Sequence, residues 1–178
     1  MRKGLITLTM LTLLFSAACL QNKSQSQQAS DALTKGLQAH AAGRLDEATK
    51  DYRDVLAHDP QNKYAYYNLG VIDQTSNRLG PAENNYRLAL SIDPNFPSAL
   101  FNLAIIRSGA GSNQEAVDLY RRAIAADPNN ARAHLNLGII LRDTGQVAEG
   151  NSEIATAVQL DPRLTPPPAP TPTATAGR

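Results

Sequence analysis

The sequence has little of several residue types, and each shortage excludes a class of structure or function. Among 178 residues there is one cysteine and no tryptophan, so no disulfide can form within the chain. Charged residues make up 19% and the formal net charge is only +1. Because a nucleic-acid-binding surface needs clustered basic residues, we expect no nucleic-acid partner.

Sequence patterns typical of catalysis and metal binding are also missing. The chain has no His-Glu-x-x-His motif, no phosphate-binding glycine loop, no Gly-x-Ser-x-Gly motif and no cysteine and histidine spacing suited to a metal. With 42% apolar residues, it has enough material for one compact domain with flanking segments. The sequence therefore predicts a protein that is not an enzyme and has no cofactor or metal site.

Long apolar stretches are confined to the N-terminus. Residues 1–3 form a basic start, residues 5–15 are mostly apolar, and residues 16–18 are small. These are the three parts of a secretory signal peptide, which we place at residues 1–18. The alternative is an uncleaved membrane anchor. No stretch in the rest of the chain reaches the roughly 18 apolar residues that a membrane-spanning helix needs.

The single cysteine, Cys19, follows the small residues directly. The run Ser16-Ala17-Ala18-Cys19 resembles the lipobox of bacterial lipoproteins, in which the cysteine is acylated with fatty acids such as palmitate and becomes the new N-terminus. Ser16 departs from that pattern, because Leu, Val or Ile is usual three residues before the cysteine, and cleavage that releases a soluble protein is the alternative. The resemblance implies export across the cytoplasmic membrane and lipid anchoring of Cys19 on the periplasmic or extracellular face.

Segments of low complexity flank the central part of the chain. The polar residues that follow Cys19 predict a flexible tether over residues 19–28. Residues 165–178 contain five prolines and little apolar bulk, which predicts a disordered tail with polyproline II character. The folded domain is therefore expected at residues 29–164.

The central part repeats itself at a fixed interval, as the following positions show. Asp-Pro pairs begin at Asp59, Asp93, Asp127 and Asp161, tyrosines recur at Tyr52, Tyr86 and Tyr120, and an Asn-Leu-Gly or Asn-Leu-Ala run begins at Asn68, Asn102 and Asn136. A period of about 34 residues is typical of a solenoid built from stacked supersecondary units. Aligned on the Asp-Pro pairs, four repeats cover residues 29–62, 63–96, 97–130 and 131–164.

Each repeat predicts two helices joined by a short turn. In the second repeat, apolar residues recur at helical spacing over residues 64–76 and 81–91, with a break at 77–80. The Asp-Pro pair ends the second helix, because proline cannot continue the hydrogen-bond ladder. Small residues such as Gly138 allow close approach of the two helices, and we expect the tyrosines to fill the space to the next repeat.

This recurrence of small, aromatic and proline positions resembles the tetratricopeptide repeat (TPR), down to the length of its period. The resemblance covers residues 29–164 and implies an all-α fold, a right-handed TPR solenoid of four helix-turn-helix repeats. The three histidines, His40, His58 and His134, fall at three different places in the repeat. We therefore expect each of them to be a surface residue.

In the TPR family the first helix of each repeat lines a concave groove. Asn68, Asn102 and Asn136 recur there at one position, and a carboxamide can both donate to and accept from the backbone of an extended peptide. Similarity to TPR arrays that hold peptides implies this role, and the alternative is that these asparagines bond a neighbouring helix. The other predicted groove residues are Tyr64, Tyr67, Phe101, Arg132 and Arg142.

A clamp for a C-terminal carboxylate, which some TPR proteins build from lysine, arginine and asparagine, is not expected. Leu33, Tyr67, Phe101 and Leu135 stand where one of its lysines would be. The groove instead mixes aromatic, aliphatic and amide groups, which suits a neutral and partly apolar segment.

The sequence thus predicts an adaptor or scaffold at the cell envelope that holds a peptide or loop of a partner protein. The alternative is a permanent structural subunit of an envelope machine, similar to the TPR lipoproteins of pilus or outer-membrane assembly. The last predicted helix, residues 147–160, carries Ile154, Val158 and Leu160. These residues predict an apolar strip that is open to a partner or to a second copy of the chain, so that self-association through this helix is one expectation.

Overall fold

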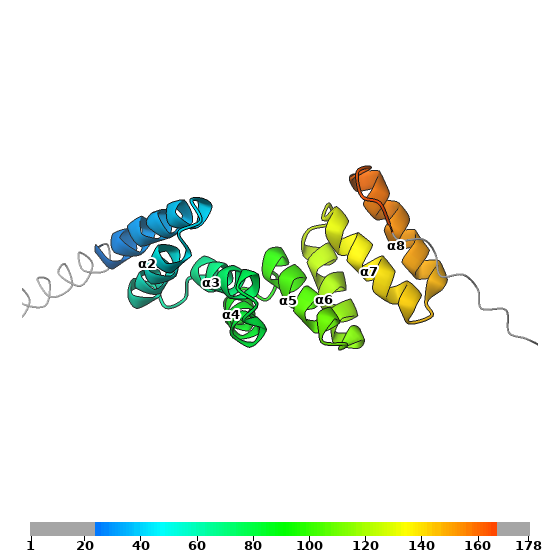
Figure 1. Ribbon diagram of the computed structural model, residues 1–178, viewed down its shortest axis with the longest axis horizontal. Helices are drawn as coiled ribbons and strands as arrows, with labels where there is room; N and C mark the ends of the chain where they lie inside the picture. Colours follow the sequence, from blue (N-terminus) through cyan, green and yellow to red (C-terminus); the bar gives the residue numbers. More distant parts are fainter. Residues whose placement is uncertain (1–23, 167–178) are drawn as a thin grey trace, which may run out of the picture. The chain divides into compact units, whose positions relative to one another are not determined.

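The computed structural model describes residues 24–166, and these form eight helices and no strand (Figure 1). A first helix covers residues 24–41. It is followed by α2 (Leu45–His58), α3 (Lys63–Thr75), α4 (Leu79–Ile92), α5 (Pro97–Gly109), α6 (Asn113–Ala126), α7 (Ala131–Asp143) and α8 (Val147–Leu160). The predicted signal peptide, Cys19 and nearly all of the predicted tail lie outside the described residues. Within those residues, no helix combines the length and the apolar character needed to span a bilayer.

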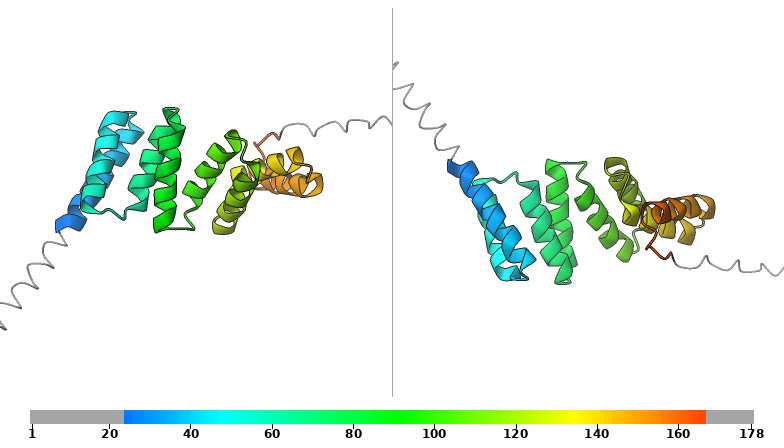
Figure 2. Two further views of the ribbon diagram at one scale, coloured as in Figure 1. Left: turned by 90° about the horizontal axis from the view of Figure 1, so that it is seen from below. Right: turned by 90° about the horizontal axis from the view of Figure 1, so that it is seen from above.

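The chain divides into two compact units between Arg78 and Leu79. Unit 1 contains the first helix, α2 and α3, and unit 2 contains α4 to α8. In unit 2 the most extensive packing joins α5 to α6 and α7 to α8, which are the two helices of one repeat (Figure 2). Helices of successive repeats also pack, α4 on α5 and α6 on α7. The third and fourth repeats therefore have the helix pairing that the sequence predicts.

The first helix begins earlier than the sequence indicates. Residues 24–28, which the sequence assigns to the flexible tether, are helical. Their polar side chains form hydrogen bonds along the helix. Nε2 of Gln28 donates to Ser24 Oγ at 3.2 Å, and Nε2 of Gln27 donates to Asp31 Oδ1 at 2.8 Å. Glutamine has a good helix propensity, and such pairs four residues apart stabilise a helix, so low complexity did not imply an irregular chain here.

The turn inside each repeat contains one residue in the left-handed backbone region. Gly43, Gly111 and Gly145 have φ of 73°, 77° and 89°, and Asn77, at the same place in the second repeat, has φ of 58°. Glycine adopts this conformation without a steric clash, and asparagine tolerates it better than most residues. The left-handed residue ends the first helix of the repeat and starts the reversal into the second.

The aspartates of the Asp-Pro pairs form a second recurring turn. Oδ1 of Asp59, Asp93, Asp127 and Asp161 accepts a hydrogen bond from the backbone N–H two residues later, at 3.3, 3.1, 3.2 and 3.1 Å. This Asx turn holds the chain as it passes from one repeat to the next. The aspartate thus shapes the connection, whereas the proline only prevents the helix from continuing.

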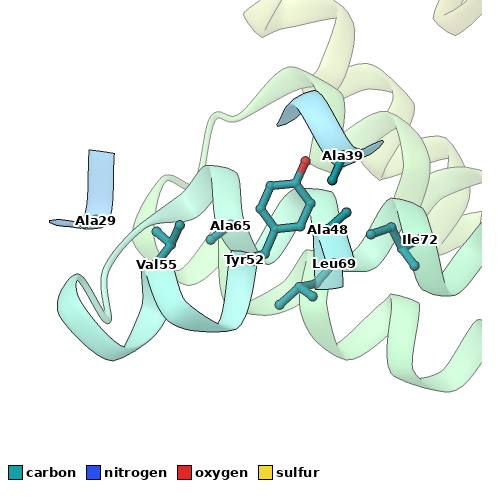
Figure 3. Close-up of a cluster of buried hydrophobic side chains, with 8 residues drawn as sticks. All are labelled: Ala29, Ala39, Ala48, Tyr52, Val55, Ala65, Leu69 and Ile72. Atoms are coloured by element: carbon teal, nitrogen blue, oxygen red, sulfur yellow. The ribbon is translucent and has the colours of Figure 1, made fainter. Parts of the chain in front are cut away.

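The recurring tyrosines are the largest side chains of the core. Tyr52, Tyr86 and Tyr120 are at most 1% exposed, which confirms the predicted burial of their rings. In unit 1 the Tyr52 ring lies at the centre of an apolar cluster drawn from the first helix, α2 and α3 (Figure 3). Fully burying a large apolar side chain contributes about 2 kcal/mol relative to leaving it exposed.

Small residues allow the helices of a repeat to come close together, as predicted. A Cβ built on Gly138 of α7 would lie 2.6 Å from the carbonyl oxygen of Gly150 in α8, and one on Gly150 would lie 2.6 Å from the carbonyl oxygen of Gly138. The two backbones therefore touch at this point, where no side chain fits. In unit 1 a Cβ on Gly36 would meet the Tyr52 ring at 2.7 Å.

Candidate functional site

The two predicted groove asparagines of unit 2 each bind a tyrosine of the preceding repeat. Nδ2 of Asn102 donates to the Tyr86 hydroxyl at 3.3 Å, and Nδ2 of Asn136 donates to the Tyr120 hydroxyl at 3.2 Å. Burial raises the pKa of the Tyr120 hydroxyl, and the bond from Asn136 offsets part of that rise. These bonds support the alternative interpretation of the asparagines, in which they fix a neighbouring helix.

Asn68 in unit 1 has a different partner, although it occupies the same place in the repeat. Its Nδ2 donates to the backbone oxygen of Tyr64, one turn earlier in α3, at 2.8 Å. The Tyr52 hydroxyl lies 3.4 Å from Nδ1 of His40 instead. Burial, together with the negative charge of Asp51, raises the pKa of Tyr52 to about 12. Asn68 therefore does not fix the buried tyrosine in unit 1.

An aromatic and cationic cluster lies on α5, α6 and α7 of unit 2. The rings of Phe101 and Tyr120 meet edge to face, with centroids 5.9 Å apart. Cζ of Arg132 lies 5.8 Å from the centroid of the Phe101 ring. Both geometries are favourable for aromatic rings, whose faces are negative and whose edges are positive. Phe101, Arg132, Asn136 and Tyr120 thus form one connected arrangement, which we call the Phe101 cluster.

The remaining predicted groove residue of unit 2, Arg142, is mostly covered. Only 8% of its surface is exposed, and its Cγ would lie 2.7 Å from a Cβ placed on Gly150. Arg142 therefore fills space between α7 and α8 and offers little to an open surface. The helical spacing that selected it does not show that α8 passes over this part of α7.

His134 is buried, so the expectation that it is a surface residue is wrong. Its Nδ1 lies 2.6 Å from Oε2 of Glu153 in α8, and its Nε2 lies 3.1 Å from the backbone oxygen of Pro128. The imidazole thus joins α7 to α8 and to the preceding turn. Its main partner lies 19 residues away in the sequence, and the pairing appears only once the helices are packed. Within residues 24–166, no group of three or more His, Cys, Asp or Glu side chains is placed to bind a metal.

Unit 1 has a surface cavity of about 520 Å³, which adjoins the predicted groove residue Tyr64. The first helix, the end of α2 and the start of α3 surround it. Its lining residues are Gln25, Ser26, Ala29, Ser30, Leu33, His58, Asp59, Asn62 and Tyr64. Tyr64 is 49% exposed, and Nζ of Lys63 lies 5.2 Å from the centre of its ring.

From the sequence, Leu33 is identified only as standing where a clamp lysine would be, and none of the other residues that the first helix gives to this cavity is identified. Ser30 and Leu33 lie one repeat period before Tyr64 and Tyr67, so the period itself could have identified them. Tyr67 is half-buried on α3. The predicted groove residues of unit 1 all lie on α3. The cavity adds apolar and polar side chains from the first helix and from the end of α2.

A second cavity, of about 400 Å³, lies in unit 2 on α4 and α6, with Leu103 of α5 among its lining residues. None of the predicted groove residues lines it. Two of its lining residues, Arg87 and Glu115, are bonded to each other at 2.9 Å. Glu115 also binds Arg107 at 2.7 Å. Ion pairs within the unit therefore occupy much of the charge around this cavity.

Two family models match the sequence. One, described as a tetratricopeptide repeat, matches residues 33–95, and the other, described as a TPR repeat, matches residues 110–145, so that together they cover more than half of the chain. The chain belongs to the tetratricopeptide-repeat family. No curated protein matches the sequence. As a TPR protein, the chain is a protein–protein interaction module.

Solved structures of other TPR proteins share the fold. MamA (41-end) from Desulfovibrio magneticus RS-1 has a TM-score of 0.67 and 21% identity, over 76% of this chain and 76% of that chain. PilF of Pseudomonas aeruginosa has a TM-score of 0.69 and 22% identity, over 79% of this chain and 64% of that chain. YrrB, a TPR protein with an unusual peptide-binding site, has a TM-score of 0.69 and 21% identity, over 83% of this chain and 75% of that chain. These likenesses confirm the predicted all-α TPR architecture.

Proposed function

We propose that this TPR protein is an adaptor of a bacterial cell envelope that binds a peptide or loop of a partner protein. The observation that carries the proposal is the cavity of unit 1. A half-exposed tyrosine, Tyr64, lies at the edge of this cavity of about 520 Å³. Tyrosine offers a large apolar ring and a polar tip, and it is enriched in protein interfaces for that reason.

The lining of the cavity indicates the kind of segment that it accepts. Ala29 and Leu33 supply apolar surface, while Ser30 and Asn62 supply hydrogen-bonding groups. One turn further along α3, the carboxamide oxygen of Asn68 accepts no hydrogen bond from the described residues. A partner segment would insert an apolar side chain beside Tyr64 and donate a backbone N–H to Asn68. The peptide-binding site named for YrrB supports this kind of ligand.

A substitution at the cavity tests peptide binding. Peptide ligands are first selected against the full chain from a random library, and their Kd is measured by fluorescence anisotropy. Tyr64→Ala is expected to weaken binding about tenfold or more, as truncating an aromatic anchor often does. Leu88→Ala is the matched control, because Leu88 is also exposed but lines neither cavity. Equal effects of the two substitutions would overturn the proposal for this cavity.

The envelope part of the proposal rests on residues 1–19. Intact-mass measurement of the mature protein tests it: we expect an N-terminus at Cys19 with the added mass of acyl chains, and loss of that mass in Cys19→Ser. Removal of the segment before Cys19 with no added mass would support soluble secretion instead. An uncleaved chain would support the membrane anchor.

A permanent structural subunit of an envelope machine, such as one for pilus or outer-membrane assembly, is the second candidate function. The observation in its favour is apolar exposure on α8, where Val147 is 44% and Leu160 is 39% exposed. The predicted apolar strip is smaller than expected, because Ile154 is buried against Gly138. A stoichiometric complex that survives detergent extraction, and whose assembly Leu160→Asp prevents, would favour this function. A dimer abolished by the same substitution would show self-association.

A further inference from the structure

Arg132 differs from most other arginines of unit 2 in its partners. Those others bind carboxylate or carbonyl oxygens: Arg87 and Arg107 bind Glu115, Arg121 binds Glu149, Arg163 binds Asp161, and Arg122 donates to the Pro94 oxygen. Arg132 is exposed. Within residues 24–166 it forms no hydrogen bond or ion pair, and its contact is with the face of the Phe101 ring.

The position of Arg132 is not explained by the stability of its helix. It lies in the first turn of α7, where the positive end of the helix dipole disfavours a cation. The helices α2, α6 and α8 carry acidic residues in their first turn, whereas α3, α4, α5 and α7 carry none. Arg132 therefore gains no stabilisation from the dipole of α7.

No acidic side chain of residues 24–166 forms an ion pair with Arg132. Helix α5, which carries Phe101, contains no acidic residue, and the acidic residue of α7 is Asp143 at its far end. A guanidinium over an aromatic ring keeps its N–H groups directed outward in its own plane, where they match the two oxygens of a carboxylate. The ring beneath is held by Tyr120, whose hydroxyl accepts a hydrogen bond from Asn136.

From this arrangement we infer that unit 2 binds a partner segment that carries an aspartate or glutamate side chain next to apolar residues. The carboxylate binds Arg132, and the apolar neighbours cover the Phe101 ring and the half-buried Leu135. A single exposed cation suits an internal acidic side chain, because a chain-terminal carboxylate is held in TPR clamps by several cations. The inference rests on the proposed peptide-binding function and specifies the chemistry of the ligand in unit 2.

The test uses the full chain and a random library of N-acetylated, C-terminally amidated dodecapeptides, so that no terminal carboxylate contributes. Enriched peptides are expected to carry Asp or Glu at one position beside apolar residues. Replacing that acid by its amide should weaken binding to the wild-type protein about tenfold, the effect of losing a charge-assisted hydrogen-bonded pair. The Arg132→Gln protein should bind the acidic peptide about tenfold more weakly and no longer distinguish acid from amide.

Arg53→Gln is the matched control, since Arg53 is also an exposed arginine but lies on α2 of unit 1. It should keep the wild-type preference for the acid. Circular dichroism should show that Arg132→Gln folds normally, because the substitution removes a cation from the start of a helix. Enriched peptides without a recurring acid, or an unchanged acid preference in Arg132→Gln, would overturn the inference and leave the peptide-binding function standing. No enrichment from the library would overturn both.

Discussion

Units 1 and 2 contain the same pair of residues at the same spacing, yet the pair forms a hydrogen bond only in unit 2. Tyr120 and Asn136 are 16 residues apart and bonded at 3.2 Å. In unit 1, Tyr52 and Asn68 have the same separation, but Tyr52 contacts His40 and Asn68 bonds to its own helix. In unit 1 the tyrosine hydroxyl thus lies next to a histidine, and the asparagine bonds within its own helix.

This difference separates two roles that one repeated position can have. In unit 2 the asparagine amide fixes a buried tyrosine and, through it, the ring of Phe101. In unit 1 the asparagine has no such role, and its oxygen accepts no hydrogen bond from the described residues. The same residue at the same place in two repeats can therefore have different roles, because each role depends on the side chains that the packed helices bring next to it.

The largest effect is expected where two backbones touch. Gly138→Ala places a methyl group 2.6 Å from a backbone oxygen of α8, which cannot move aside without separating the helices. We expect a loss of about 3 kcal/mol in the free energy of unfolding. Gly36→Ala places its methyl group 2.7 Å from the fully buried Tyr52 ring, which has little room to move, so it should also destabilise the fold. Urea unfolding followed by circular dichroism measures both, with Gly80→Ala as a control because no other atom lies within 4 Å of its new methyl group.

The second effect concerns alkaline pH. Burial and Asp51 raise the pKa of Tyr52 from 10.0 to about 12, so the folded protein keeps this proton while the unfolded chain loses it. Stability should therefore be complete below pH 10 and fall as the pH rises from 10 through 12. Tyr52→Phe should flatten that fall more than Tyr120→Phe, because Asn136 offsets part of the rise at Tyr120. Thermal unfolding between about pH 8 and pH 12 provides the measurement, and an equal flattening in both variants would contradict the contrast.

A smaller effect tests the hydrogen bond itself. In a double-mutant cycle, Tyr120→Phe and Asn136→Ala should show a coupling energy of about 1 kcal/mol, the usual net contribution of one hydrogen bond. The corresponding cycle of Tyr52→Phe and Asn68→Ala should give a coupling energy near zero. Urea unfolding of the four single and two double variants measures both energies. A clear coupling in unit 1 would mean that Asn68 also contacts Tyr52.

The smallest effect is expected at the turns. Asn77 has φ of 58° at a position where the other three repeats have glycine. Asn77→Gly should raise the free energy of unfolding by about 0.5 kcal/mol, because glycine adopts this conformation without strain. Gly111→Ala, at the same place in the third repeat, should lower it by about 1 kcal/mol. Thermal unfolding measures both changes, and two changes of the same sign would show that the turns are not equivalent.

Much of the fold could be predicted from the sequence because it depends on short-range rules. The repeat period, the turn glycines, the Asp-Pro pairs and the buried tyrosines each act through neighbouring residues or through the next repeat. The candidate site was predicted less completely. Tyr64, Asn68, Phe101 and Arg132 stay predictions made from their places in the repeat, and the cavity that Ser30 and Leu33 line was not predicted.

The sequence by itself determined the family, the helix pairs and the positions that face the next helix, because helical periodicity and backbone sterics are local properties. Only the tertiary structure decided which atoms those positions meet. The burial of His134 against Glu153, the covering of Arg142 and the different partners of Asn68 and Asn136 depend on side chains brought together from separate helices. For each of these side chains the sequence offers several hydrogen-bond partners of the same chemical type. The distances in the packed molecule decide which one is bound.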